Sequence, residues 1–187
     1  MELDLTRLVT AEGDESGLRD AISRVVVASV SALKATTLAS ARTKAGPAID
    51  VLLVHPGSAP RVLEDADRMS LNNVRIALDA VETLPEAAAG GVRADGDVLR
   101  VSLTCSGADR LLYTNTHPAS DVTVALDLGV PIRRPVVRRD ATGAEALVFR
   151  SIAVLTARVV APFDASELSR LLNRIRRLIE DPAFAAV

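Results

Sequence analysis

The spacing of apolar positions changes along this chain, and each spacing predicts a type of element. Apolar residues recur three and four positions apart, as on one face of a helix, in three segments: residues 18–35, 70–84 and 166–180. Alternating or β-branched apolar runs predict strands in a larger set of segments: residues 1–9, 48–54, 61–63, 98–104, 110–114, 121–128, 131–139 and 147–160. In the first helix Ser23 falls off the apolar stripe, and Ser70 is the expected cap of the second helix. Residues 36–47 and 85–96 are expected connections, and residues 140–143 are expected to form the turn of a hairpin between the last two strands. Helices dominate first, strands later, and a helix closes the chain, which favours an α+β fold or a layered α/β sandwich.

The stretch from Ser151 to Pro182 combines the strongest of these patterns. Its first ten residues form an apolar, β-branched run, and a helix is expected from Ser166 to Glu180. Asp164 or Ser166 can cap this helix by accepting hydrogen bonds from its free N–H groups. A strand that leads into a helix N-terminus is a common place for chemistry, because backbone N–H groups and a positive dipole end meet there.

Composition narrows the class of protein. The 187 residues suit a single domain, and with three Phe, one Tyr and no Trp its core must be built from Val, Leu, Ile and Ala. A net charge of −2 argues against a nucleic-acid partner. The lone Cys105 excludes an intrachain disulfide and a multi-thiolate metal site, and two histidines argue against zinc. We find no signal segment and no apolar run of about 18 residues, so we expect a cytoplasmic protein without a membrane span.

Several motifs carry a resemblance to a known family. The phrase Leu178-Ile-Glu-Asp-Pro182, which closes the last predicted helix, resembles the L-L-E-D-P ending of the acyltransferase component of 2-oxo acid dehydrogenase complexes. Leu63 to Leu71, LEDADRMSL, is similar to that family's entry into its central helix. Gly129 to Val137, GVPIRRPVV, is similar to its hairpin start, and Asn115 to Ala125 stands where the family has a turn and a strand. The resemblance covers the whole chain and implies a chloramphenicol acetyltransferase-like two-layer fold, a mixed sheet with helices packed on one face.

The family's central motif is altered in this sequence. There a strand ends in H-x-x-x-D-G, and counting back over the last helix places the aspartate on Asp164, the histidine on Val160 and the glycine on Ala165. In the family the histidine deprotonates the thiol of coenzyme A or dihydrolipoamide, and the thiolate attacks a thioester. General-base catalysis is worth roughly 10²–10⁴-fold and needs a base within hydrogen-bond reach, which a valine does not supply. The resemblance thus implies the fold and argues against the ordinary reaction.

Other candidate site residues each have a structural alternative. Ser102 and Thr104 lie in the strand that resembles the one bearing the family's oxyanion-stabilising hydroxyl, but they also fit the polar face of any strand. Asp164 fits a plain helix N-cap as well as an active-site position. His117 and His55 are candidates for a relocated base, although a histidine before a proline is also typical of a solvated loop.

Cys105 and the arginines of the last predicted helix also have a structural alternative. Cys105 is a possible nucleophile, but a small buried hydrophobic residue fits its position better. The last helix carries four arginines, which fit a solvated face or contacts with the phosphates of coenzyme A: Arg170, Arg174, Arg176 and Arg177. Coenzyme A is therefore a possible cofactor, and no metal is expected.

Two functions from different classes follow from these residues. We favour a catalytically degenerate relative with a structural, assembly or regulatory role, because no replacement base has a clear local context. The resemblance implies a homotrimer or larger homo-oligomer, with possible association with 2-oxo acid dehydrogenase subunits. The alternative is a coenzyme A-dependent acyltransferase whose base has moved to His117 or His55. A binding module for acyl-thioesters or another small ligand is a third possibility.

Overall fold

The computed structural model describes residues 1–11, 14–36, 48–54, 60–81, 98–105, 122–139, 141–159, 165–181 and 183. The predicted strand at 110–114 lies outside these residues, as do most of the connections predicted at 36–47 and 85–96. Within them the helices are α1 (Glu15–Lys34), α3 (Leu71–Val81) and α4 (Ala165–Glu180), with a short 3-10 turn, η1 (Ala66–Arg68). The strands are β1 (Glu2–Asp4), β2 (Ala48–Val54), β3 (Arg61–Leu63), β4 (Val98–Cys105), β5 (Val124–Leu128), β6 (Ile132–Arg139) and β7 (Glu145–Val159).

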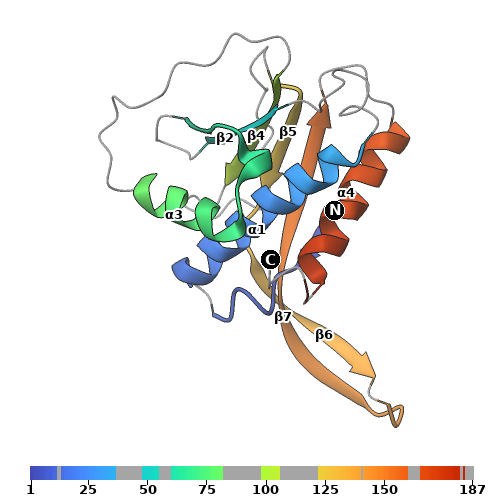
Figure 1. Cartoon of the computed structure of the whole chain (residues 1–187). Coiled ribbons are helices and arrows are strands. Elements are labelled where there is room, and N and C mark those ends of the chain that lie inside the picture. Colours follow the sequence, from blue (N-terminus) through green and yellow to red (C-terminus); the bar gives the residue numbers. More distant parts are fainter. Residues whose placement is uncertain are drawn as a thin grey trace.

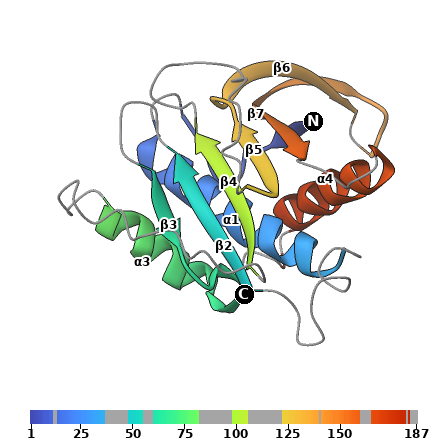
Figure 2. The same cartoon turned by 90° about the horizontal axis from the view of Figure 1, so that it is seen from above.

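The seven described strands form one mixed sheet. Its order is β1-β7-β5-β4-β2-β3, and β6 pairs with the first half of β7. The central strands β2, β4 and β5 are parallel, whereas β3 and β7 run antiparallel to their neighbours. The three described helices cover one face of this sheet (Figures 1 and 2). This arrangement confirms the predicted α/β two-layer fold with helices on one face.

Helix α1 is buried on almost all sides, which the sequence pattern did not predict. It begins at Glu15, three residues before the predicted start, and Asp14 caps it by accepting from the Gly17 backbone N–H at 2.8 Å. The expected single apolar stripe left Ser23 on the polar side, but Ser23 is fully buried and donates to the Arg19 carbonyl oxygen at 2.9 Å. The reason is that α1 lies between α3 and α4 on the sheet (Figure 2).

Helix α4 is amphipathic, as predicted. Its predicted apolar face contains three buried residues and three half-buried ones: Leu171, Ile175 and Ile179, then Leu168, Leu172 and Leu178. The four arginines of this helix are exposed, which agrees with a solvated face. For α3, the predicted cap is also confirmed, because the Asn73 N–H donates to Ser70 Oγ at 3.2 Å. Removing the apolar faces of these helices from water stabilises the fold by roughly 25 cal/mol per Å².

Strands β6 and β7 form a long hairpin that projects from the body of the molecule (Figure 1). The predicted turn is confirmed, with Gly143 at a φ of 85°, a left-handed conformation that glycine adopts without strain. The prediction of a buried strand over residues 151–160 is correct only in part. Among its described residues, 151–159, Ser151, Ala153 and Leu155 are buried, because the strand has only one face on the core.

The root of the hairpin is fixed to the N-terminal segment by a chain of hydrogen bonds. Thr6 Oγ1 donates to Asp4 Oδ1 at 2.6 Å and accepts from the backbone N–H of Ser151 at 2.9 Å. The hydroxyl of Ser151 in turn donates to the carbonyl oxygen of Val9 at 2.7 Å. Asp4 also accepts from Arg150 at 2.6 Å. The first strand and the turn after it are thereby held against the middle of β7.

Candidate functional site

The strand–helix joint that carries the altered motif is bracketed by described elements. Strand β7 ends at Val159, and α4 begins at Ala165, which is exposed. The joint itself lies outside the described residues, and so do the predicted site residues Val160 and Asp164. Their roles, and those of His117 and His55, which also lie outside, stay predictions.

The two predicted hydroxyls belong to a row of polar side chains on the sheet face opposite the helices. The members of this buried polar row are Asp50, Arg100, Ser102, Thr104 and Asp127. Each is between 1% and 6% exposed, so the polar face of β4 is as dry as its apolar face. The sequence pattern predicted the alternation along β4 but not this burial. Burying a polar group costs free energy unless the group forms hydrogen bonds. A buried polar row of this size is therefore expected where the polar side chains have a specific role.

The sheet register places the members of the row next to each other. Asp50 on β2 is the partner of Arg100 on β4, and Thr104 is the partner of Asp127 on β5. The row continues onto β7, where Thr156 is the partner of Asp127 and donates a long hydrogen bond to its carboxylate at 3.4 Å. At the other end, Asp50 accepts from a backbone N–H at 3.0 Å. Side chains at directly opposed positions are close enough to interact.

The pKa of the Cys105 thiol is affected both by burial and by the charge of this row. The thiol is 4% exposed, and burial, with a further contribution from the negative charge of Asp127, raises the pKa of Cys105 to about 12. A nucleophilic cysteine needs a lowered thiol pKa, because the thiolate is the reactive form. The burial of the thiol therefore fits a small hydrophobic residue, and the raised pKa disfavours a nucleophile at neutral pH.

The same electrostatic effect applies to any second anion beside Asp127. An oxyanion that bound the Thr104 hydroxyl would lie beside the Asp127 carboxylate, in surroundings of low dielectric constant where like charges repel strongly. Oxyanion sites use donors and positive dipoles for the opposite reason, to stabilise the developing negative charge. The register thus places a carboxylate beside Thr104, and the roles of Thr104 and Ser102 as oxyanion donors stay predictions.

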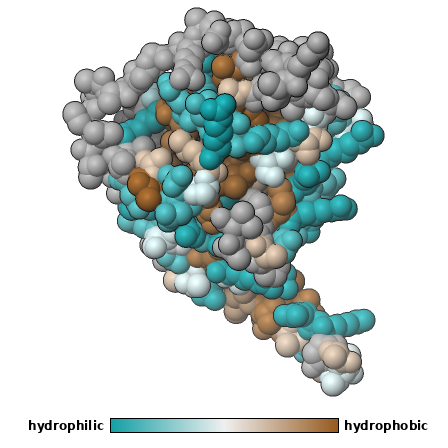
Figure 3. Space-filling model, in the orientation of Figure 1, coloured by the Kyte–Doolittle hydropathy of each residue, from teal (hydrophilic) through white to brown (hydrophobic). Residues whose placement is uncertain are grey.

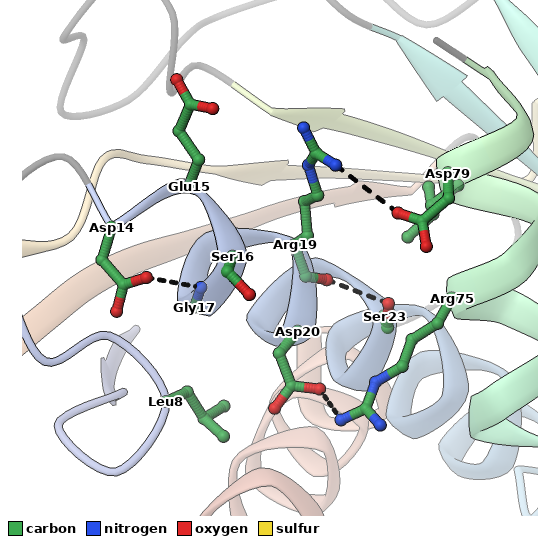
Figure 4. A pocket seen from close by; sticks show the side chains of 11 residues that line it. Leu8, Asp14, Glu15, Ser16, Gly17, Arg19, Asp20, Ser23, Arg75 and Asp79 are labelled. Atoms are coloured by element: carbon green, nitrogen blue, oxygen red, sulfur yellow. Dashed lines mark hydrogen bonds and ion pairs between the residues drawn. The ribbon is translucent and has the colours of Figure 1, made fainter. Parts of the chain in front are cut away.

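A hollow of about 850 Å³ lies at the N-terminus of α1, between this helix and α3. Its charged side chains are oriented toward one another: Arg19 pairs with Asp79 at 3.5 Å, and Asp20 with Arg75 (Figure 4). Asp20 also pairs with Arg24 of its own helix at 3.1 Å. The pairs Arg19–Asp79 and Asp20–Arg75 join α1 to α3, and among the described residues no predicted site residue lines the hollow. We assign it a structural role.

A groove of about 960 Å³ runs between the hairpin, β1 and the end of α4. It contains arginines and carboxylates that pair across it, such as Arg134 with Glu2 at 2.8 Å and Arg150 with Asp4 at 2.6 Å. Of the arginines that the resemblance linked to coenzyme A, only Arg176 lines it, and Arg176 pairs with Glu180 at 3.0 Å. The structure does not bring these arginines and the predicted hydroxyls to one place.

Two kinds of feature are absent from the described ranges. No group of three or more His, Cys, Asp or Glu side chains there is arranged to hold a metal ion. No helix among the same residues combines the length and the apolar character needed to cross a bilayer.

Comparison by sequence finds no match, whereas comparison by structure finds proteins of the same fold. No family model matches the chain, and neither does any curated protein. Among solved structures, a probable dihydrolipoamide acetyltransferase from Listeria monocytogenes 4b F2365 matches with a TM-score of 0.65 at 16% identity, covering 96% of this chain and 82% of that one. The dihydrolipoamide acetyltransferase of Azotobacter vinelandii matches all of this chain and 82% of its own, with a TM-score of 0.60 at 16% identity.

A third match extends the comparison to an assembly. The cubic core of the pyruvate dehydrogenase multienzyme complex has a TM-score of 0.59 at 16% identity and covers 100% of this chain and 82% of that chain. At these identities the likeness concerns the fold. The chain has the α/β fold of dihydrolipoamide acyltransferase catalytic cores, which is the fold that the sequence motifs implied.

Sequence reasoning missed most of the buried polar row. Asp127 interrupts the apolar run Val124-Ala-Leu-Asp-Leu128, and Asp50 interrupts the run from Ala48 to Val54. An acidic residue inside a buried strand was the available signal, since such residues are almost never fully buried without a partner. The pairing of Thr104 with Asp127 depends on the strand order, which the pattern of apolar positions does not give.

Proposed function

We propose that this chain is a catalytically degenerate protein with the acyltransferase fold, acting as a structural, assembly or regulatory subunit of a homo-oligomer. The observation that carries the proposal is the valine at position 160, which directly follows β7, four residues before Asp164 and five before α4. Val160 offers no proton acceptor where the resemblance places the catalytic imidazole. A missing base removes the step that generates the thiolate.

The comparison with the Azotobacter enzyme supports this interpretation. Its catalytic mechanism was investigated through one serine, one histidine and one asparagine, the last two four positions apart. Val160 and Asp164 have the same spacing in this chain. The chain would then keep a polar residue in place of the amide and replace the imidazole with an aliphatic side chain.

Two observations on the described side chains point the same way. The carboxylate of Asp127 beside Thr104 disfavours an oxyanion at that hydroxyl. The pKa of Cys105, raised to about 12 by burial and by the charge of Asp127, disfavours this thiol as a substitute nucleophile. The helices and the sheet that support the site are nevertheless fully formed, which suits a protein kept for its shape and its contacts.

An oligomer is proposed from the fold together with the third comparison. One protein of this fold forms the cubic core of a multienzyme complex. We infer a homotrimer or a larger assembly for this chain, with possible association with 2-oxo acid dehydrogenase subunits. The localisation that fits such partners is cytoplasmic.

The test is an acetyl-transfer assay with the purified full chain, acetyl-coenzyme A and dihydrolipoamide. We expect no product above that of a heat-denatured control. Turnover by the native chain overturns the proposal. If that turnover is lost in His117→Ala or in His55→Ala, it supports the alternative, a coenzyme A-dependent acyltransferase with a relocated base. Calorimetry with coenzyme A in the same preparation separates loss of chemistry from loss of binding.

A further inference from the structure

The exposed face of α4 carries three arginines in a row. Arg170, Arg174 and Arg177 are exposed and stand four and three residues apart, so their side chains lie within about 60° of one another around the helix axis. At a rise of about 1.5 Å per residue the row is about 10 Å long. We call these three side chains the arginine row. In Figure 3 the edge of the molecule that α4 forms in Figure 1 is hydrophilic, whereas apolar surface follows the projecting hairpin.

The arginine row has no acidic partner within the part of the chain that the structure describes. Glu180, near the end of the same helix, pairs with Arg176 at 3.0 Å. The next carboxylate, that of Asp181, accepts from the Ala183 backbone N–H at 2.9 Å. By contrast, the arginines of the hollow between α1 and α3 pair with carboxylates. Because like charges three and four residues apart destabilise a helix, the row destabilises α4 unless an anion binds it.

The surroundings of the row indicate which class of anion it suits. The hollow and the groove described above are not lined by any member of the row, so a small ligand such as a free phosphate has no concave site in either of them. Among the described residues of α4 no large hydrophobic side chain is strongly exposed, so the helix lacks the apolar anchors of a bilayer-binding helix. The net charge of −2 disfavours a nucleic acid. These observations favour the acidic surface of another protein.

The spacing of the row indicates the shape of that surface. Three side chains on one face of a strand span about 13 Å, whereas carboxylates at positions i, i+4 and i+7 of a helix span about 10 Å, as the arginines do. The neighbouring exposed side chains, Ser166, Ser169 and Asn173, are short, which lets a second helix approach. We propose that the arginine row binds an acidic helix of a partner protein, with carboxylates at these three positions that accept paired hydrogen bonds from the guanidinium groups.

The probe is a synthetic alanine-rich helical peptide of about 20 residues with Glu at positions i, i+4 and i+7. The same peptide with Gln at these positions is the control ligand. Binding to the full chain is measured by fluorescence anisotropy in about 50 mM and about 500 mM NaCl. We expect the Glu peptide to bind about tenfold more tightly than the Gln peptide in low salt, and to lose this advantage in high salt, because exposed ion pairs are screened.

Two triple variants show whether the place of the charge matters. The row variant carries three substitutions on α4: Arg170→Gln, Arg174→Gln and Arg177→Gln. The matched control replaces, also with Gln, three other exposed arginines that have no carboxylate partner among the described residues: Arg7, Arg133 and Arg138. Both variants have the same net charge. We expect the row variant to bind the Glu peptide about tenfold more weakly than wild type, since each exposed ion pair contributes a factor of about two to three, and the control to stay within about twofold.

A charge exchange tests the register of the contact. Arg174→Glu should weaken binding of the Glu peptide, and a peptide with Lys in place of the middle Glu should restore it to within about threefold of wild type. Failure of this rescue contradicts the proposed spacing. Unfolding in urea shows whether the row variant is folded, and if it is not, the single variant Arg174→Gln replaces it, with an expected loss of about twofold to threefold.

Several outcomes overturn the proposal. They are equal binding of the Glu and Gln peptides, equal losses in the two triple variants, and no binding of the Glu peptide up to about 1 mM. Tighter binding of the wild type to anionic vesicles or to single-stranded DNA also overturns it, and assigns the row to that polyanion. The inference goes beyond the proposed function, because it concerns a contact with a different protein and needs neither the homo-oligomer nor the loss of catalysis. Acetyl transfer, if found, would overturn the catalytic part of the proposed function without affecting these results.

Discussion

The hydrogen bonds at the root of the hairpin give a prediction whose magnitude can be worked out. Thr6→Val keeps the shape of the side chain but removes the hydroxyl that accepts from the Ser151 N–H at 2.9 Å and donates to Asp4 at 2.6 Å. An N–H left unsatisfied costs about 1–3 kcal/mol, and the lost bond to a charged group adds to this. Asp4 can form a hydrogen bond to water in place of the lost one, which offsets part of these costs. We therefore expect a total loss of about 2–3 kcal/mol in the free energy of unfolding at pH 7.

The effect of Thr6→Val also depends on pH. Burial would raise the pKa of Asp4, but hydrogen bonds from Thr6 and then the charge and hydrogen bond of Arg150 outweigh it, so the pKa lies below its ordinary 3.8. A carboxyl whose pKa is lower in the folded state stabilises the fold above its unfolded pKa, and this contribution is lost as the pH falls through the folded value. The gap between wild type and variant should therefore be largest near neutral pH and shrink below about pH 4.

The assay is urea unfolding of both proteins at pH 7 and in the acid range, with Thr10→Val as the matched control. Thr10 also donates to a carboxylate, at 3.2 Å from Asp14, but that contact is exposed. We expect the control to change the free energy of unfolding by less than about 0.5 kcal/mol. The reasoning is refuted if Thr6→Val is no more destabilising than the control, or if its effect grows as the pH falls.

Two further predictions concern α1 and Cys105. Gly17→Ala should destabilise the protein by about 1–3 kcal/mol in urea unfolding, because the added Cβ would clash with the Leu8 carbonyl oxygen. This loss is expected even though alanine favours helices over glycine by about 1 kcal/mol. Cys105, 4% exposed and with a pKa of about 12, should resist alkylation in the native protein at pH 7.5 and react fully in urea.

Each of these two predictions has a direct control. Ser16→Ala, at the exposed neighbouring position in the first turn of α1, meets no such clash and should stay within about 0.5 kcal/mol of wild type. A more stable Gly17→Ala protein would show that Leu8 can move away. For the thiol, stoichiometric labelling of the native protein within minutes would contradict the burial of Cys105 beside Asp127.

The periodic elements of this fold were predictable, and the contacts between them were not. The three-and-four spacing from Leu168 to Ile179 gave α4 almost to the residue, because one face of that helix is exposed. The same reasoning placed Ser23 on a polar face of α1, since periodicity describes one buried face and α1 has neighbours on both sides as well as the sheet. Tertiary packing overrides the local pattern in such central elements.

In the candidate site, too, the local positions were predictable from the sequence and the contacts between strands were not. Ser102 and Thr104 were placed correctly on one face of β4, because alternation along a strand is a local property. The carboxylate of Asp127, which lies beside Thr104, comes from β5, 23 residues further along the chain. Its position depends on strand order and register, which here followed from the resemblance to a fold and not from the spacing of apolar residues.

The central claim is that the chain has the acyltransferase fold without the proton acceptor at the end of β7. The most direct measurement is the rate of acetyl transfer from acetyl-coenzyme A to dihydrolipoamide by the full chain between pH 6 and 9. The account predicts a rate equal to that of the heat-denatured control at every pH. An enzyme with a histidine base would instead show a rate that rises with an apparent pKa near the ordinary histidine value of about 6.5, and that result would contradict the account.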